Sequence, residues 1–212
     1  MSNNAQEHIN QLTNKGKIRY LDISNRDLSG SADLKEFTAL TSLNSYNNKF
    51  ENLDFLDTLP NKNQLQKINF FGNQIKEIDL SWLLETFPNL EYMNCENNPL
   101  SAKNLENLTG EQFGKLVQGI KDKKIKINSW KGTILMDLLE YAQKLVAKGD
   151  NNQTQNAQYL QTLISNNSPT KSDEKQPGNN TPLLVGGLVI FGVSALVIGY
   201  LWGKKKNKLK EE

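Results

Sequence analysis

Histidine and cysteine, the side chains most often used as catalytic bases, nucleophiles and zinc ligands, are scarce in this 212-residue sequence. The chain has one histidine, His8, and one cysteine, Cys95. A serine or cysteine nucleophile needs a nearby base, and zinc sites draw on several nitrogen or sulfur ligands. One copy of each residue type excludes an internal disulfide and any zinc site built on two thiolates or two histidines. We therefore expect no metal site and no cofactor.

Sequence motifs typical of catalysis are also missing. The chain has no glycine-rich phosphate-binding loop, no H-E-x-x-H pair and no G-x-S-x-G elbow. Glu91 and Glu96 fall on the solvent side of one expected strand, which is typical of a solvated face rather than of an acid–base pair. Cys95 falls on a core position, where a thiol behaves as a small apolar group. We therefore expect that the protein is not an enzyme.

The charge balance argues against a nucleic-acid-binding protein. The formal net charge is only +2, and the last ten residues alone hold five lysines against two glutamates. Only Arg19 and Arg26 are arginines, and among the internal lysines at 121, 123, 124, 126 and 131 there is no arginine and a single aromatic residue, Trp130. These lysines suit the end of a helix and an edge strand. Contact with anionic lipid is the alternative interpretation.

Four segments of one pattern must position any functional side chains. They begin at Ile18, Leu40, Leu65 and Leu90, which are 22, 25 and 25 residues apart, and each fits L-x-x-L-x-L-x-x-N-x-L. Internal repetition at such a period indicates a repeat architecture. The pattern resembles the leucine-rich-repeat family over about residues 15–105. The resemblance implies an α/β fold, a short solenoid of about four repeats at 18–105 with parallel strands on its concave face.

The pattern also predicts which side chains are buried. We expect the first, fourth and sixth positions to point into the core, the fourth and sixth because they alternate along a short strand. Ninth-position Asn48, Asn73 and Asn98 can satisfy backbone groups of neighbouring turns, forming an asparagine ladder. Two positions depart from the pattern, because Arg26 replaces the first asparagine and Ser45 replaces an apolar residue. The expected core positions are Ile18, Leu21, Ile23, Leu40, Leu43, Ser45, Leu65, Ile68, Phe70, Leu90, Met93 and Cys95.

Segments on both sides of the repeats are expected to cover their apolar ends. Residues 1–17 form an N-terminal cap in which Ala5, Ile9 and Leu12 have helical spacing. Residues 106–164 form a helical C-terminal cap, which opens with the capping-box pair Thr109 and Gln112. Later helices are expected at 133–147 and 155–164, and Ile125 and Ile127 alternate with lysines as in an edge strand or extended turn.

The C-terminal part of the sequence predicts a membrane anchor. Residues 165–182 are almost without apolar side chains and read as a disordered linker. Leu183–Trp202 contains no charged residue, and twenty helical residues span about 30 Å, the thickness of a bilayer core. The basic tail 203–212 follows, with Lys204, Lys205 and Lys206 at the membrane flank. Because the N-terminus has no apolar signal segment, we expect the repeats in the cytosol. The lysine flank favours the outward-facing alternative.

Polar and aromatic side chains lie between the core positions of each strand, and the family resemblance places them on the concave face. Exposed rings beside side-chain amides are typical of protein-binding patches. We therefore expect a membrane-anchored module that binds a partner protein on this face, without catalysis. The alternative is an outward-facing adhesin or receptor-like protein. The partner and the oligomeric state stay open. The candidate partner-binding residues are Tyr20, Asp22, Asn44, Tyr46, Asn69, Phe71, Tyr92 and Asn94.

Overall fold

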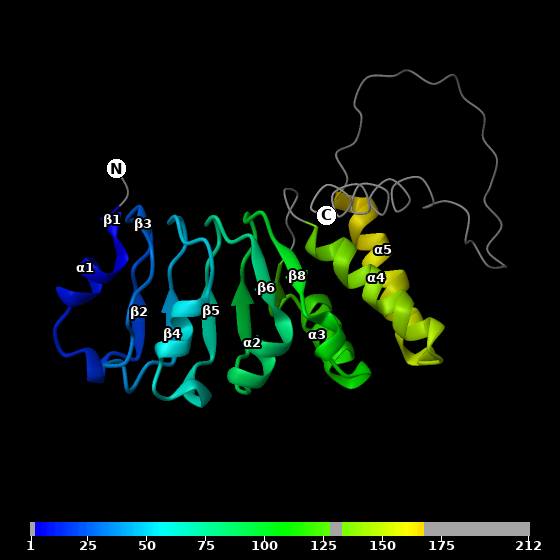
Figure 1. Cartoon of the computed structure of the whole chain (residues 1–212), viewed down its shortest axis with the longest axis horizontal. Helices are drawn as coiled ribbons and strands as arrows, with labels where there is room; N and C mark the ends of the chain where they lie inside the picture. Colours follow the sequence, from blue (N-terminus) through cyan, green and yellow to red (C-terminus); the bar gives the residue numbers. More distant parts are fainter. Residues whose placement is uncertain (1–2, 128–132, 168–212) are drawn as a thin grey trace, which may run out of the picture. The chain divides into compact units, whose positions relative to one another are not determined.

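A five-stranded parallel sheet lies at the centre of the structure. Its strands run side by side in chain order, and each pairs in parallel with the next. Figure 1 shows the first of them beside one another from the blue to the green part of the ribbon. The strands are β2 (Tyr20–Asp22), β4 (Ser42–Asn44), β5 (Lys67–Asn69), β7 (Tyr92–Asn94) and β9 (Ile125–Lys126).

The structure is a computed structural model, and it describes residues 3–127 and 133–167. The chain divides into two units, 1–168 and 169–212. Every helix and strand in the described ranges belongs to the first unit.

Two smaller parallel pairs and several 3-10 helices lie before, between and after the central strands. β1 (Asn3–Asn4) pairs with β3 (Leu28–Ser29), and β6 (Glu77–Asp79) pairs with β8 (Ser101–Lys103). The short helices differ from one connection to the next. They are η1 (Lys15–Lys17), η2 (Asp54–Thr58), η3 (Lys62–Gln64), η4 (Leu105–Asn107) and η5 (Asn151–Gln153).

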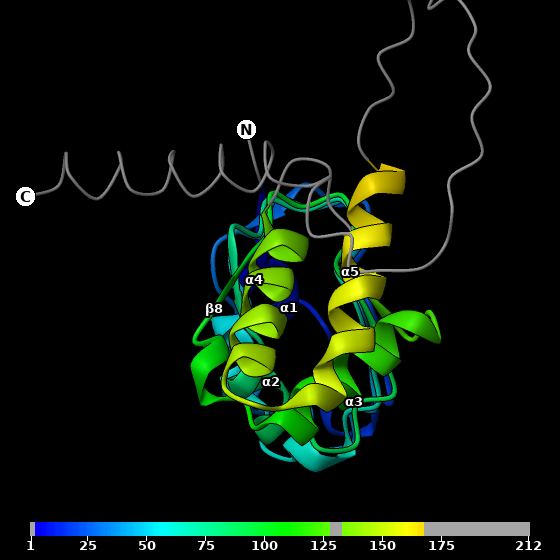
Figure 2. The same ribbon diagram turned by 90° about the vertical axis from the view of Figure 1, so that its right-hand side faces the viewer.

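Five α-helices complete the domain, and the first three begin at side-chain caps. Asn4, Asp79 and Thr109 each accept a hydrogen bond from the backbone N–H three residues later, which satisfies a group that the helix leaves free. Figure 2 shows α4 and α5 side by side, and they pack against each other. The helices are α1 (Ala5–Asn10), α2 (Leu80–Thr86), α3 (Gly110–Lys121), α4 (Ile134–Ala147) and α5 (Thr154–Asn167).

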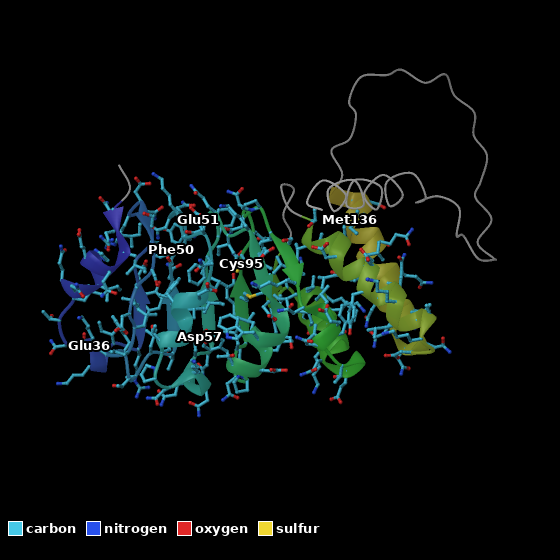
Figure 3. The ribbon with its side chains drawn as sticks, in the orientation of Figure 1. Glu36, Phe50, Glu51, Asp57, Cys95 and Met136 are labelled. Carbon is cyan, nitrogen blue, oxygen red and sulfur yellow. The ribbon has the colours of Figure 1, made fainter. Side chains whose placement is uncertain are left out.

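The predicted core positions lie where the alternation placed them. Ten of the twelve are buried, and Ile18 and Leu90 are half-buried. Ser45 is buried too, and its hydroxyl accepts a hydrogen bond from Asn48 Nδ2 at 3.2 Å. The hydroxyl that departs from the apolar pattern therefore has a hydrogen-bond partner in the interior. In Figure 3 the Cys95 sulfur and the Phe50 ring lie inside the domain.

The flanking helices also match their predicted positions. Thr109 and Gln112 form the full capping box, with each side chain bonded to the other's backbone N–H. β9 is an edge strand of the central sheet, as the alternation at Ile125 indicated. α5 continues to Asn167, three residues into the segment predicted as a linker.

The fold class expected from the sequence, a leucine-rich-repeat solenoid with a helical cap and a membrane-spanning helix, is wrong. The described residues form an α/β domain with a mostly parallel central sheet, and no repeat solenoid is seen among them. The strand pattern recurs, but the connections do not. η2 and η3 join β4 to β5, whereas β6 and α2 join β5 to β7. A solenoid requires the whole unit to repeat, not the strand alone.

The membrane expectation is corrected as well. Among residues 3–127 and 133–167, no helix combines the length and the apolar character needed to cross a bilayer. A single-pass membrane protein is therefore not supported by this part of the chain. The predicted span Leu183–Trp202 and the flanking Lys204, Lys205 and Lys206 lie outside the described residues.

Candidate functional site

The register of the central sheet brings the predicted polar residues into one row. Asp22 pairs with Asn44, Asn44 with Asn69, and Asn69 with Asn94. Neighbouring strands lie about 4.8 Å apart, so four polar side chains follow one another across the sheet. Lys126 of β9 pairs with Asn94 and extends the row by a positive charge that sequence reasoning did not assign to it.

The four predicted aromatic residues do not form one cluster. Asn47 N–H donates to the backbone oxygen of Phe71 at 2.8 Å, which sets Tyr46 and Phe71 on adjacent chain segments beyond the polar row. Tyr20 and Tyr92 lie on the other side of that row, on β2 and β7, with two strands between them. The arrangement is therefore an adjacent pair, Tyr46 and Phe71, plus two separate rings.

Exposure decreases along the polar row, from the exposed Asp22 on β2 to the buried Asn94 on β7. Tyr20 is 58% exposed and Phe71 36%, and they are the most exposed large apolar side chains among the described residues. Asn94, at the other end, is only 9% exposed. The phenylalanine ring has no polar group that can hydrogen-bond to water. Phe71 is therefore the residue on this face whose burial by a partner would be most favourable in free energy.

The rings of this face do not cover one another. Ring contacts among the described residues lie elsewhere, for example between Phe50 and Phe70 in the core. Of the four rings of this face, Tyr92 has a cation contact within the described residues, because Lys126 Nζ lies 5.7 Å from its ring centroid. No ring contact within the described residues therefore involves Tyr46 or Phe71.

Side chains in the polar row are held by local hydrogen bonds. The Oδ1 atoms of Asn69 and Asn94 each accept the backbone N–H two residues later, at 3.1 Å. Asn44 is different: its Nδ2 donates to the Tyr20 hydroxyl at 3.3 Å, while its Oδ1 is buried and has no partner within the described residues. A buried acceptor without a donor is costly, so Asn44 is the weakest point of the row.

Asp22 is the one carboxylate in the row. Burial raises the pKa of Asp22, but hydrogen bonds from the Ser24 hydroxyl and backbone, from Asn44 and from Tyr20 outweigh it, and the pKa lies below its ordinary value. Asp22 is thus a fixed negative charge at neutral pH, at the opposite end of the row from Lys126.

The predicted asparagine ladder is present behind this face. Asn48 Nδ2 donates to the backbone oxygen of Ile23 at 2.9 Å, and Asn98 Nδ2 donates to that of Phe70 at 2.8 Å. Asn73 does the same with Ser45. Each amide joins its own turn to the turn before it, which fixes the height of neighbouring strands and hence the alignment of the row.

Tight turns next to the face use residues that tolerate positive φ. The residues that follow Tyr46 and Phe71 both have this conformation, with φ of 53° at Asn47 and 67° at Gly72. Asparagine and glycine adopt it at the least cost. The same left-handed conformation occurs at Asn25 and Asn97 in the flanking turns.

The single cysteine and the single histidine, whose side chains are the most reactive in the sequence, are not among the residues of this face. Cys95 is buried, and burial raises the pKa of its thiol to about 12. Burial and the nearby Arg26 guanidinium lower the pKa of His8, which lies on α1. In the described part of the chain, no group of three or more histidine, cysteine or acidic side chains is placed to hold a metal ion.

Sequence reasoning missed one feature, an apolar cavity next to β9. Its walls come from α3, β9, α4 and α5, which are distant in the sequence, so no local pattern could reveal it. The only local signal was the set of lysines near residue 123, whose role the sequence left open.

Comparison with models of known protein families and with curated proteins finds no match for this chain.

Proposed function

We propose that this protein is an interaction module that binds a partner protein on the exposed face of its central sheet and catalyses no reaction. The observation that carries the proposal is the adjacent pair Tyr46 and Phe71, with Phe71 open to solvent beside a row of aligned amides. Aromatic side chains bury about 150–250 Å² each and dominate interface energetics. The amides offer directional hydrogen bonds around them.

The rigidity of the face supports the same proposal. The strands that carry it are fixed in register by the ladder amides of Asn48, Asn73 and Asn98. A surface that is already ordered loses little conformational entropy on binding, so more of the contact energy appears as affinity.

The proposal is tested by site-specific crosslinking in the full chain. A photo-reactive phenylalanine analogue replaces Tyr46, and a matched chain carries the same analogue at Gln118, an exposed position of α3. We expect one protein to crosslink from position 46 and not from position 118. A partner that crosslinks from both positions, or from neither, would contradict a specific face.

The crosslinked protein then provides an affinity test. Central aromatic contacts typically contribute about 2 kcal/mol or more, which is roughly 30-fold in Kd. Phe71→Ala combined with Tyr46→Ala should weaken binding at least that much and leave the unfolding midpoint near that of the parent. The matched control, Lys115→Ala with Gln118→Ala on α3, should bind as the parent does. Unchanged affinity in the double aromatic variant would move the site elsewhere.

A further inference from the structure

We propose that the cavity beside β9 binds an acidic peptide segment, with one large apolar side chain inserted and carboxylates paired with the surrounding lysines. This site shares Lys126 with the end of the polar row but does not depend on the aromatic pair Tyr46 and Phe71.

The cavity has the size of a side-chain socket. Its volume is about 290 Å³, at the lower end of the range of ligand pockets and too small for a large cofactor. Its apolar walls are Ile120, Ile125, Ile127, Leu135, Tyr159 and Leu163. Such a wall favours an apolar occupant, because burial of a leucine-sized side chain is worth about 1.5–3 kcal/mol.

Three lysines line the same cavity, and none of them forms an ion pair within the described residues. They are Lys121, Lys123 and Lys126, against a single acidic lining residue, Glu96. Lys121 Nζ donates to Asn156 Oδ1 at 2.9 Å and lies 5.2 Å from the Tyr159 ring centroid, so it is held over the cavity by uncharged partners.

Most lysines elsewhere in the described chain are paired with acidic side chains. Eight of them form ion pairs with nearby carboxylates, such as Lys76 with Glu51 at 2.8 Å. The cavity therefore concentrates positive charge that the domain does not neutralise. A ligand with carboxylates on both sides of an apolar group would complement it in charge and in shape.

A peptide fits these features better than a membrane or a nucleic acid. A lipid surface is contacted by a broad basic face, whereas here the lysines line one half-open apolar cavity. Nucleic-acid sites use arginine and aromatic stacking on bases. The one ring at this cavity, Tyr159, is already covered by Lys121.

The test uses a fluorescein-labelled peptide, Glu-Glu-Leu-Glu-Glu, and the full-length protein, with binding followed by fluorescence anisotropy at low ionic strength. We expect saturable binding that weakens as salt is added, since the contacts are partly ionic. Replacing the peptide leucine by alanine should weaken binding at least tenfold, because the socket is then left unfilled.

Charge reversal in the protein locates the site. Lys123→Glu with Lys126→Glu should weaken peptide binding more than tenfold. The matched control, Lys148→Glu, reverses an exposed lysine at the end of α4 that does not line the cavity, and should bind within twofold of the parent. Circular dichroism melting of both variants checks that the fold is retained.

Four results would overturn the assignment. They are no peptide binding by the parent protein, equal binding of the leucine and alanine peptides, equal loss in the Lys148→Glu control, and tighter binding to phosphatidylserine vesicles or a single-stranded oligonucleotide with the same lysine dependence. Phe71→Ala with Tyr46→Ala should leave peptide binding unchanged, which separates this proposal from the sheet-face site.

Discussion

Asn73 Nδ2 donates a hydrogen bond of 2.9 Å to the backbone oxygen of Ser45, which lies 28 residues earlier in the chain. The same side chain accepts a bond from Phe50 N–H at 3.1 Å. Asn73 is 6% exposed, so these bonds form in the interior. One side chain thus supplies both a donor and an acceptor to a buried turn that the strands themselves do not satisfy.

Asn73→Ala should therefore destabilise the domain strongly. The change leaves the buried Phe50 N–H without its acceptor, and an unsatisfied buried group costs about 1–3 kcal/mol. It also removes one of the two amide donors from each of the Ser45 and Phe70 carbonyls. We expect the free energy of unfolding in urea to fall by about 2–4 kcal/mol. Asn63→Ala, at an exposed asparagine, is the matched control and should change it by less than about 0.5 kcal/mol. Equal losses in the two variants would refute the ladder's role.

Replacing two of the glycines by alanine should change the stability of the domain in opposite directions. Gly72 has φ of +67°, and an added Cβ would collide with Asn47 Oδ1, so Gly72→Ala should cost about 1–3 kcal/mol. Gly114 lies within α3, where a Cβ would meet nothing closer than 4.0 Å. Gly114→Ala should stabilise by about 0.5–1 kcal/mol, because alanine is the better helix former. Thermal unfolding of both variants measures the difference, and a shift in the same direction for both would contradict this interpretation of the turns.

The Cys95 thiol should be inert in the folded protein. Its pKa of about 12 keeps it protonated at neutral pH, and its side chain is buried, whereas thiol reagents attack the exposed thiolate. We expect no reaction with an aromatic disulfide reagent under native conditions and one equivalent of reaction in guanidinium chloride. Rapid stoichiometric labelling of the native protein would show that the strand around Cys95 opens easily.

Because of Asp22, the free energy of unfolding of the domain should depend on pH in the acid range. The pKa of Asp22 is lower in the folded chain than the value near 3.9 of an unfolded aspartate. Its contribution is therefore fully present above the unfolded pKa and is lost as the pH falls through the lower folded pKa. Asp22→Asn should lose less stability than the parent between pH 5 and pH 2. Urea unfolding of both proteins across that range measures this, and parallel curves would exclude the effect.

Periodic apolar residues predicted the strands and the core well, because burial on one side of a strand leaves an alternating pattern. Leu43 and Ile68 lie on equivalent positions of neighbouring strands, as expected. The capping box at Thr109 was equally readable, since its two residues lie within one turn. Features that are set by residues within about one helical turn of each other, or by strict alternation along a strand, can thus be predicted from the sequence.

What the sequence could not provide depends on contacts between distant segments. β1 and β3 each consist of two residues, and their pairing rests on a few backbone bonds that no side-chain pattern encodes. The fold class was wrong because the strand pattern repeats while the connections vary. The candidate face was predicted residue by residue, but only the register revealed that Tyr46 and Phe71 adjoin each other and that Tyr20 and Tyr92 stand apart.

The asparagine ladder has a mechanical consequence. Each ladder amide donates a hydrogen bond to the turn before it, and Arg26 in the first turn has no such amide. These hydrogen bonds therefore all point toward the N-terminal end of the sheet. A force applied at the N-terminus would meet these hydrogen bonds one at a time rather than all together. The domain should then yield in a series of small steps that begin at β2, and each detached strand would leave the remaining sheet with its own hydrogen bonds intact.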